Sequence, residues 1–346
     1  LFFFNHKTPY QILSGLVGSE MCIRDSVDSG IDLTAAKYNG GGTGNATRGL
    51  YIGGTTGSVV NVIEHMTLAS TANFVDFGDL IQVTNSNGAV SSPTRTVCLG
   101  GSAPGGRINN IQYVTISTTG NAADFGDLLG TRTPNAGASS NAIRGIVMGG
   151  AAPGPVASNS NTIEFITLTT SGEVTDFGDA TSNTGAINNN SASNTIRGVY
   201  LNARTADGGA EKNILEFITI ATTGASNGFG ELSSSRWGAA GVNSPTRGVF
   251  AGGATPTLLK SIEFVTIATL GDSQDFGEVS TANRNIFPAC SSTRGVFAGG
   301  SVSPTFLNTI EFITIATLGN ASDFVDLATI RGRGAGVSNS IRGCFI

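Results

Sequence analysis

The sequence predicts an all-β protein made of repeated four-stranded sheets, and three observations support this prediction. Glycine contributes 49 of the 346 residues, about twice the usual usage of ~7%, which favours many turns between short elements. Hydrophobic residues make up 39% of the chain and charged residues only 12%, so a core can form easily. No window keeps a helical apolar period, whereas a unit of four apolar segments recurs along the chain.

An arginine marks each repeat unit. It stands in a Thr/Ile-Arg-Gly tripeptide, with threonine in place of the glycine once, and the successive spacings are 47, 49, 53, 50, 47 and 48 residues. The seven positions are Arg48, Arg95, Arg144, Arg197, Arg247, Arg294 and Arg342. An apolar run that ends in a double glycine, as at Gly252-Gly253, follows in most units, whereas the fourth unit has Asn202-Ala203.

Each unit is expected to form four strands, A to D in chain order, and the sixth unit illustrates them. Strands A, B, C and D are expected at Asn285–Ser291, Arg294–Gly300, Ile310–Thr317 and Ser322–Leu327. In strand C, Ile310 and Phe312 point to one face, while Ile313 and Ile315 point to the other. Since both faces are apolar, each sheet must be covered on both sides.

Small sheets packed face to face around an axis satisfy this requirement, whereas a barrel or a two-sheet sandwich would expose one face. The sequence therefore predicts a β-propeller over residues 27–346. Six complete units lie between two remnants. The remnant before them, Val27–Asn45, contains strands D and A, and the remnant after them, Ile341–Ile346, contains strand B. We expect these remnants to share a seventh blade that lacks strand C, with Val27–Leu33 and Ile341–Ile346 in one sheet region. A fragment cut from a longer array is the alternative.

An apolar strand that ends in Gly-Gly, inside a four-strand unit of about fifty residues, resembles the kelch family. The resemblance covers residues 47–346, although kelch repeats carry a Tyr and a Trp after the glycines and this chain has one tryptophan, Trp237, and five tyrosines. The chain is therefore kelch-like. Arrays of the RGVFAGG, IEFITIAT and DFGDL type also resemble repeat proteins of marine phages and environmental viral sequences. This second resemblance implies a virion or extracellular setting.

Residues 1–26 share no pattern with the repeats. The string VGSEMCIRDS resembles a translated sequencing-adapter read-through, so we expect this leader to be non-native. A genuine unrelated leader and a secretion signal are the alternatives, and the apolar run Leu1–Phe4 is short for a signal peptide. Localisation is therefore not inferred from this end of the chain.

Charged residues recur at fixed places in the unit. The strand B arginine and the first aspartate of the Asp-Phe-Gly-Asp motif should lie near the same end of the blade, so we expect a structural Arg–Asp pair in each blade. The aspartates are Asp76, Asp124, Asp176, Asp275 and Asp323, and Gly228 takes this place in the fourth unit. The strand C glutamate, replaced once by Gln112, is expected to cap backbone amides between blades. A ring of arginines that binds an anion in the central channel is the functional alternative.

The chain has few histidines and cysteines that could take part in catalysis, and we expect neither enzymatic activity nor a cofactor. Its two histidines are His6, in the leader, and His65, which replaces an aromatic residue of strand C and is expected to be packed. Cys98, Cys290 and Cys344 have spacings that fit neither zinc sites nor disulfides, so we expect buried apolar substitutes. The net charge of −5 gives no basic field for nucleic acid, and no apolar stretch is long enough to predict membrane insertion.

The loops between strands B and C differ in every unit whereas the strands recur, which is typical of a rigid support that presents a binding surface. Leu258, Leu259, Phe306 and Leu307 form the candidate contact patch, with drift in unconstrained loops as the alternative. We therefore expect a non-catalytic binding or adhesion propeller, such as a virion or tail-fibre module that recognises a host-surface protein or glycan. A purely structural propeller within a larger virion or cell-surface protein is the second candidate.

Overall fold

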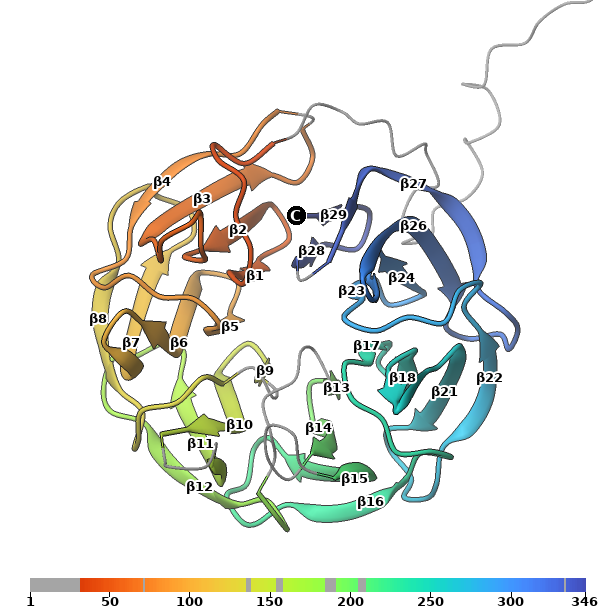
Figure 1. The fold of residues 1–346 in the computed structure, drawn as a ribbon. Coiled ribbons are helices and arrows are strands. Elements are labelled where there is room, and N and C mark those ends of the chain that lie inside the picture. The colour runs from red at the N-terminus through yellow and green to blue at the C-terminus, as the bar shows by residue number, and fades with distance from the viewer. Residues whose placement is uncertain are drawn as a thin grey trace, which may run out of the picture.

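The computed structural model describes residues 32–346, with the exception of 71, 135–137, 154–157, 184–190, 205–209 and 333. All regular structure in this part of the chain is β-strand, and the blades stand in a ring around a central opening (Figure 1). Six blades are antiparallel four-stranded sheets, and the seventh position holds two strands. The predicted all-β class and propeller architecture are confirmed. The leader, residues 1–26, lies outside the described residues.

The strands of each blade follow one another from the opening to the perimeter. The first blade comprises β1 (Gly41–Gly44), β2 (Arg48–Ile52), β3 (Val62–Thr67) and β4 (Val75–Asp79). The second comprises β5 (Gly88–Ser91), β6 (Arg95–Ala103), β7 (Gly106–Thr115) and β8 (Ala123–Asp127). The third comprises β9 (Ala138–Ser140), β10 (Arg144–Ala152), β11 (Ser158–Thr167) and β12 (Thr175–Asp179). The fourth comprises β13 (Ser191–Ser193), β14 (Arg197–Arg204), β15 (Glu211–Thr219) and β16 (Asn227–Glu231).

The fifth and sixth blades carry short additional strands in their B–C connections. The fifth comprises β17 (Ala240–Asn243), β18 (Arg247–Ala251), β21 (Ser261–Thr266) and β22 (Gln274–Glu278), with the hairpin β19 (Ala254–Thr255) and β20 (Thr257–Leu258). The sixth comprises β23 (Phe287–Cys290), β24 (Arg294–Ala298), β26 (Thr305–Thr314) and β27 (Ser322–Arg331), with β25 (Ser301–Val302) on β26. The seventh position holds β28 (Gly336–Ser338) and β29 (Gly343–Phe345).

The sixth blade departs from the expected strand bounds at both of its outer strands. Strand C begins at Thr305, because a short hairpin pairs Ser301 with Phe306 before the main ladder starts. Strand D continues to Arg331, which pairs with Leu307 beyond an irregularity in the register. The expected strand order is unchanged, so the differences lie only in where each ladder ends.

The hydrophobic core is divided among the interfaces between neighbouring blades, since each sheet is apolar on both faces. Between the third and fourth blades, for example, Met148 and Phe177 pack against Tyr200 and Ile218. Equivalent clusters fill the other interfaces, including the one between β28 and the first blade. The two-sided apolar pattern of strand C therefore has the role predicted for it.

The double glycine at the end of strand B allows that strand to meet the loop between strands D and A. Gly53 and Gly54 have φ values of 63° and 99°, a region that residues with a side chain rarely adopt. The Gly54 amide donates to the Thr84 carbonyl at 2.9 Å. A Cβ on Gly53 would lie 2.3 Å from that same oxygen. Glycine is thus required here by both conformation and space.

The two ends of the described chain meet in the ring. β28 lies between β23 and β1, and Leu33 packs against the cluster that contains Val337 and Ile346. Across the junction, the Asn339 side-chain amide donates to the Ala46 carbonyl at 2.8 Å. The terminal regions therefore meet as expected, but among the described residues β29 pairs only with β28, so the expected shared sheet of Val27–Leu33 and Ile341–Ile346 stays a prediction. Residues 27–31 lie outside the described residues, and Asp32 and Leu33 belong to no strand.

One assignment within the closure was wrong. We expected strand A of the N-terminal remnant to belong to the seventh blade, but β1 pairs with β2 in the first blade, with Gly41 opposite Ile52. Strand A of the seventh position is β28, which pairs with β29. Among the described residues, the N-terminal side therefore supplies no strand to the seventh position, because each strand A forms its hairpin with the strand B that follows it.

Candidate binding face

The strand B arginines lie between blades, where they stack on aromatic rings. The guanidinium carbon of Arg144 is 4.5 Å from the centre of the Phe165 ring, and that ring meets Phe177 edge-on at 6.0 Å. Arg95, Arg197, Arg247 and Arg294 stack in the same way on the strand C ring of their own blade. A cation over an aromatic face is stabilised by the quadrupole of the ring.

Most of the repeat arginines also donate hydrogen bonds to the next blade. Arg144 Nη1 donates to the Ile220 carbonyl at 2.8 Å, and Arg247 Nη1 donates to the Ile315 and Ala316 carbonyls at 2.9 and 3.0 Å. Arg48, Arg95 and Arg197 donate to equivalent carbonyls just after strand C of the following blade. Each of these five arginines therefore connects two neighbouring sheets, whereas Arg294 Nη1 has no hydrogen-bond partner.

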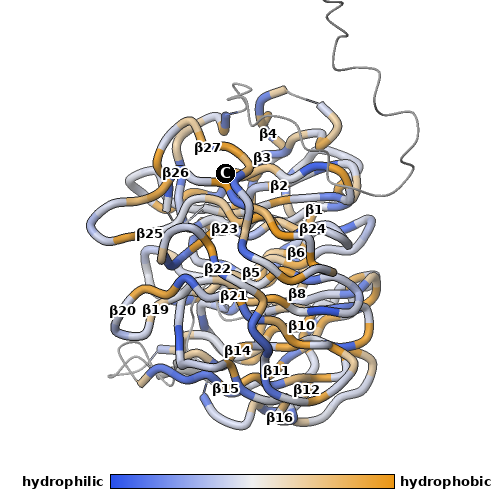
Figure 2. Tube along the Cα trace, turned by 90° about the vertical axis from the view of Figure 1, so that its right-hand side faces the viewer, coloured by the Kyte–Doolittle hydropathy of each residue, from blue (hydrophilic) through white to orange (hydrophobic). Residues whose placement is uncertain are grey.

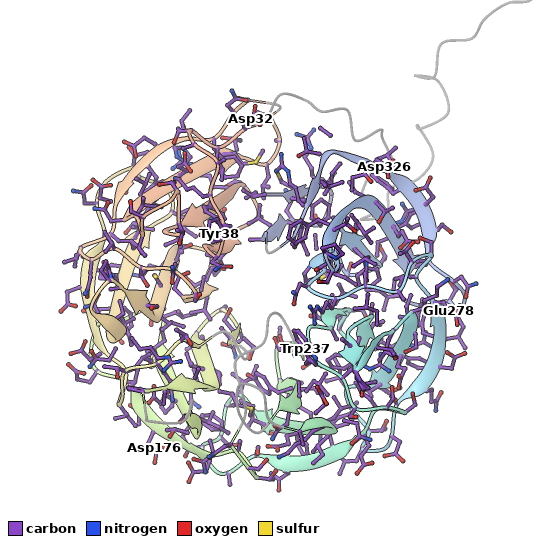
Figure 3. All side chains as sticks on the ribbon, viewed as in Figure 1. Asp32, Tyr38, Asp176, Trp237, Glu278 and Asp326 are labelled. Atoms are coloured by element: carbon purple, nitrogen blue, oxygen red, sulfur yellow. The ribbon has the colours of Figure 1, made fainter. Side chains whose placement is uncertain are left out.

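The expected Arg–Asp pair is wrong. Within the described residues, none of the repeat arginines forms an ion pair with a repeat aspartate. In the third blade Arg144 lies on the face of Phe165, whereas Asp176 pairs with Glu164, whose side chain points to the opposite face. Asp176 is exposed at the perimeter, where its carboxylate accepts a hydrogen bond from the Gly178 amide at 3.1 Å (Figure 3).

The strand C carboxylates cap backbone amides of the preceding blade, as expected. Glu164 Oε1 accepts from the Leu129 amide at 3.1 Å, and Glu311 Oε1 accepts from the Ser280 amide at 2.8 Å. Glu64, Gln112, Glu216 and Glu263 accept from equivalent amides. Through these hydrogen bonds, the side chains connect the start of each D–A loop to the next sheet.

Three of these carboxylates also form buried ion pairs that the sequence analysis missed. The pairs are Lys37–Glu64, Arg132–Glu164 and Arg236–Glu263. Each basic residue stands four positions after the last apolar residue of a strand D, such as Leu128 or Leu232. In the unit with Gln112, this position is the uncharged Thr84. This matched loss of both charges was a partial signal in the sequence, because Glu311 is kept although Asn283 stands at the basic position.

The position five residues after the last apolar residue of strand D lies in the D–A loop, near the mouth of the central opening. Tyr38, Asn85, Thr133, Trp237 and Arg284 are equivalent, because each forms an isolated bridge with the chain just beyond a strand B. These bridges give the five backbones the same conformation and leave the side chains different. Figure 3 places Tyr38 and Trp237 on opposite sides of the opening. Tyr38 is 46% exposed, and the Arg284 guanidinium lies 4.2 Å from the Trp237 ring centre.

The opening itself is lined by backbone and small uncharged side chains. A cavity of about 190 Å³ lies among residues of the inner strands and D–A loops, including Asn39, Asn87, Ala138, Ser191 and Asn285. None of the repeat arginines lines it. The alternative of an arginine ring that binds an anion in the channel is therefore wrong, because the strand B arginines are directed between blades.

The candidate contact residues in the B–C connections lie on the same side of the ring as these D–A loops. Leu258 ends β20 and Leu259 follows it, while Phe306 and Leu307 belong to β26. Figure 2 shows β20 and β25 projecting from one face of the disc. Phe306 is 39% exposed, whereas the other three side chains are half-buried. We call the surface formed by the D–A and B–C connections the loop face.

The loop face has the opposite charge from the perimeter. Lys260 is exposed there, and Arg107, Lys212, Arg284 and Arg331 are half-buried. Among the described residues of these connections, Glu211 is the only acidic one. The outer strands instead carry exposed carboxylates such as Asp124. Figure 3 shows Asp176 and Glu278 at the perimeter. The chain therefore presents a basic face inside an acidic rim, although its net charge is −5.

The other titratable groups singled out in the sequence are packed. His65 is buried, with its ring edge-on to Phe77, and burial followed by the charge of Arg48 lowers its pKa. Cys98, Cys290 and Cys344 are free thiols in strands, and burial raises the pKa of Cys98 to about 12. The described residues contain no group of three or more His, Cys, Asp or Glu side chains that could hold a metal ion. The buried positions expected for His65 and Cys98 are confirmed, whereas Cys290 and Cys344 are half-buried.

No protein-family model matches the chain, and the search of curated proteins finds no significant similarity. The described part of the chain contains no helix long and apolar enough to cross a membrane.

Proposed function

We propose that this protein is a non-catalytic, kelch-like binding module that attaches to an acidic protein or glycan surface through its loop face. The observation that carries this proposal is the set of five equivalent positions at the mouth of the opening. Their backbones are held alike by the same bridge, yet their side chains differ, and Tyr38, Asn85, Trp237 and Arg284 are exposed or half-buried whereas Thr133 is buried. A repeat that keeps its scaffold and varies one surface position is suited to recognition.

The chemistry of the loop face indicates the kind of partner. Lys260, Arg284 and Arg331 supply positive charge, while Tyr38 and Trp237 supply aromatic surface beside it. Such a surface attracts carboxylate or sulfate groups, and the acidic perimeter repels them, so binding is directed to one face. A host-surface partner of a virion or tail-fibre protein would fit this arrangement. A purely structural propeller remains the second candidate function, favoured by the interblade contacts of the recurring charges.

The test is binding of immobilised dextran sulfate and of poly-glutamate, measured by surface plasmon resonance at several salt concentrations. The variant Lys260→Ala/Arg284→Ala should lose at least tenfold in affinity for one probe while its melting temperature stays within about 2 °C. The matched control, Asp124→Asn/Glu278→Gln, removes charge from the perimeter and should not weaken binding. If both variants bind the probes equally, or neither probe binds at low salt, the loop face is not the site.

A further inference from the structure

Glu311, the strand C carboxylate of the sixth blade, is buried with a single hydrogen bond. It is 5% exposed, and among the described residues its polar contact is the Ser280 amide, which donates to Oε1 at 2.8 Å. The equivalent Glu263 of the fifth blade accepts from the Ser233 amide, from two serine hydroxyls and from the Arg236 guanidinium. Since a buried carboxylate is costly without such partners, Glu311 lacks most of the compensation that Glu263 has.

Two replacements explain the loss of these donors. Asn283 stands at the position of Arg236. Ala321 stands at the position of Ser273, whose hydroxyl is one of the two serine donors of the fifth blade. The Asn283 side-chain amide donates to the Gly299 carbonyl at 3.3 Å, and the alanine side chain has no donor. The sixth unit therefore keeps the carboxylate and has lost two of the side chains that compensate it.

The other units indicate what belongs beside this carboxylate. In the first blade, the Lys37 ammonium lies 2.6 Å from Glu64 Oε2, and both side chains are buried. An arginine pairs with the carboxylate in the third and fifth blades. The second unit has neither charge, because Thr84 and Gln112 stand at the two positions. A basic group thus accompanies the carboxylate in three blades, and one unit loses both charges together.

The fourth unit also has an uncharged residue at the basic position, but its carboxylate is compensated differently. Glu216 accepts from the amide and the hydroxyl of Thr181. The Asn202 side chain and the Ser226 hydroxyl donate to it as well. Among the described residues, Glu311 is therefore the strand C carboxylate that has neither a basic partner nor a set of neutral donors.

Backbone carbonyls also face the place of the guanidinium. In the fifth blade, Arg236 Nη1 donates to the Gly252 and Ser261 carbonyls at 3.2 and 3.3 Å. The equivalent carbonyls of the sixth blade belong to Gly299 and Thr309. These two residues are joined by the same backbone hydrogen bond as their equivalents. The sixth blade therefore keeps the acceptors of the guanidinium, although its own side chain at this position is neutral.

Asn283 adds an oxygen that has no partner. The residue is 3% exposed, and its Oδ1 accepts no hydrogen bond. Carboxylate, carbonyl and amide oxygens are the ligands that hard cations such as potassium and calcium prefer in proteins. A single carboxylate balances one positive charge, and a lysine ammonium fills the equivalent place in the first blade. The composition of the site therefore favours a monovalent ion.

We propose that Glu311 and Asn283 hold a monovalent cation of the potassium and ammonium class between the fifth and sixth blades, in the place that a basic side chain takes in the first, third and fifth blades. The carboxylate balances the charge of the ion. Asn283 supplies its amide oxygen, and the carbonyls of Gly299 and Thr309 supply further ligands. The bound ion joins the D–A loop before the sixth blade to the end of strand B. The inference goes beyond the proposed function and does not depend on the ligand of the loop face.

The test compares melting temperatures in the chlorides of potassium, calcium and tetramethylammonium at equal ionic strength. Tetramethylammonium is too large for the site and therefore corrects for general effects of salt. Potassium should raise the melting temperature of the parent protein by at least about 3 °C relative to tetramethylammonium. Glu311→Gln removes the carboxylate and should show no difference between the salts. The matched control Glu278→Gln removes an exposed carboxylate of the perimeter and should keep the whole gain.

Asn283→Arg provides a second measurement, because it supplies the basic side chain that Arg236 provides in the fifth blade. This variant should melt at a higher temperature than the parent in tetramethylammonium and should lose the potassium gain. In the parent, potassium should slow hydrogen exchange of residues 280–285 at least about threefold and should leave the equivalent residues 233–238 unchanged.

Equal melting temperatures of the parent in potassium and tetramethylammonium would overturn the proposal. So would a potassium gain in Glu311→Gln or Asn283→Arg as large as that of the parent. A gain with calcium alone would contradict the monovalent assignment.

Discussion

Arg144 illustrates what a single repeat residue does in the folded chain. Its guanidinium stacks on Phe165 of its own blade and donates to the Ile220 carbonyl of the next. A half-buried cation–π contact contributes about 0.5–2 kcal/mol, and a hydrogen bond from a charged donor adds about 1.5–3 kcal/mol. Because this contact recurs around the propeller, the arginine stabilises the interface between neighbouring blades. Its partners are an aromatic side chain and a backbone carbonyl.

Three of the repeat arginines differ only in their second contact, so they form a matched series. Arg197 and Arg247 both stack on phenylalanine and both donate to two carbonyls, whereas Arg294 Nη1 has no acceptor. Replacement of Arg197 or Arg247 by Ala should reduce the free energy of unfolding equally, by about 2–4 kcal/mol. The loss for Arg294→Ala should be about 1–2 kcal/mol smaller. Urea denaturation measures all three. A larger loss for Arg247 than for Arg197 would instead support the discarded aspartate partner.

The ion pair Arg236–Glu263 makes stability depend on acid pH. Burial alone would raise the pKa of Glu263, but Arg236, the Ser233 amide and the hydroxyls of Ser273 and Ser233 outweigh it and hold the pKa below its usual 4.5. A lowered pKa in the folded state stabilises the protein above the unfolded pKa, and this stability is lost as the pH falls through the folded value. The free energy of unfolding should therefore decrease below about pH 4.5, and Glu263→Gln should remove part of this decrease.

Unit two provides the control for that pair, because it has Thr84 and Gln112 at the same two positions. At pH 7, Glu263→Gln alone leaves Arg236 buried without its counter-ion and should cost about 3 kcal/mol or more. The double variant Arg236→Thr/Glu263→Gln copies unit two and should recover most of this loss. Thermal unfolding of the parent protein, the single variant and the double variant measures these differences in stability. A double variant that is no more stable than the single one would show that the pair is not a coupled unit.

At the scale of elements, strands could be predicted from the sequence and their registers could not. The two-sided apolar pattern of Ile310–Ile315 was enough to indicate a sheet covered on both faces, since the alternation of a strand is a local property. The face of the aspartate depends on a β-bulge that recurs between strands C and D, as at Ile163 and Glu164. A bulge shifts the partner strand by one residue, and no residue pattern in a single unit revealed it.

The binding face was predicted only in part, for a related reason. The variability of the B–C loops was visible in the sequence, and these loops do lie on the loop face. Tyr38, Trp237 and Arg284 were missed because they are separated in sequence and become equivalent only through bridges to the end of strand B. Their constant offset from strand D could have identified them, had the units been aligned from that strand.

Strands and loops should differ sharply in their tolerance to substitution. Ile262 of β21 is completely buried between blades, so Ile262→Ala should cost about 2–5 kcal/mol through the cavity that it leaves. Phe306 and Leu258 lie at the edge of the loop face, so Phe306→Ser and Leu258→Ser should each cost less than about 1 kcal/mol. Chemical denaturation compares the three variants. Losses of equal size would place these loop residues in the core.

At the scale of the whole molecule, stability is distributed around a ring that must close. Each interface contains its own apolar cluster and most contain an arginine hydrogen bond, so no single interface is the core. The last contact of the series joins residues 272 positions apart, because Arg342 Nη1 donates to the Ser70 carbonyl at 2.6 Å. Asn339 and Ala46 join the same two blades at the turns between strands A and B. These contacts make the ends of the repeat array neighbours.

The measurement that tests this closed ring most directly is crosslinking across the junction. Ala46→Cys/Asn339→Cys places thiols at two turns whose residues are hydrogen-bonded in the closed ring. The control Ala46→Cys/Asn194→Cys uses the equivalent turn of the fourth blade, on the far side of the opening (Figure 1). A short bismaleimide followed by peptide mass spectrometry should link residues 46 and 339 within a monomer in most molecules and should not link 46 to 194. If positions 46 and 339 remain unlinked while the protein is folded, the ring is open and the account of a seven-position propeller is wrong.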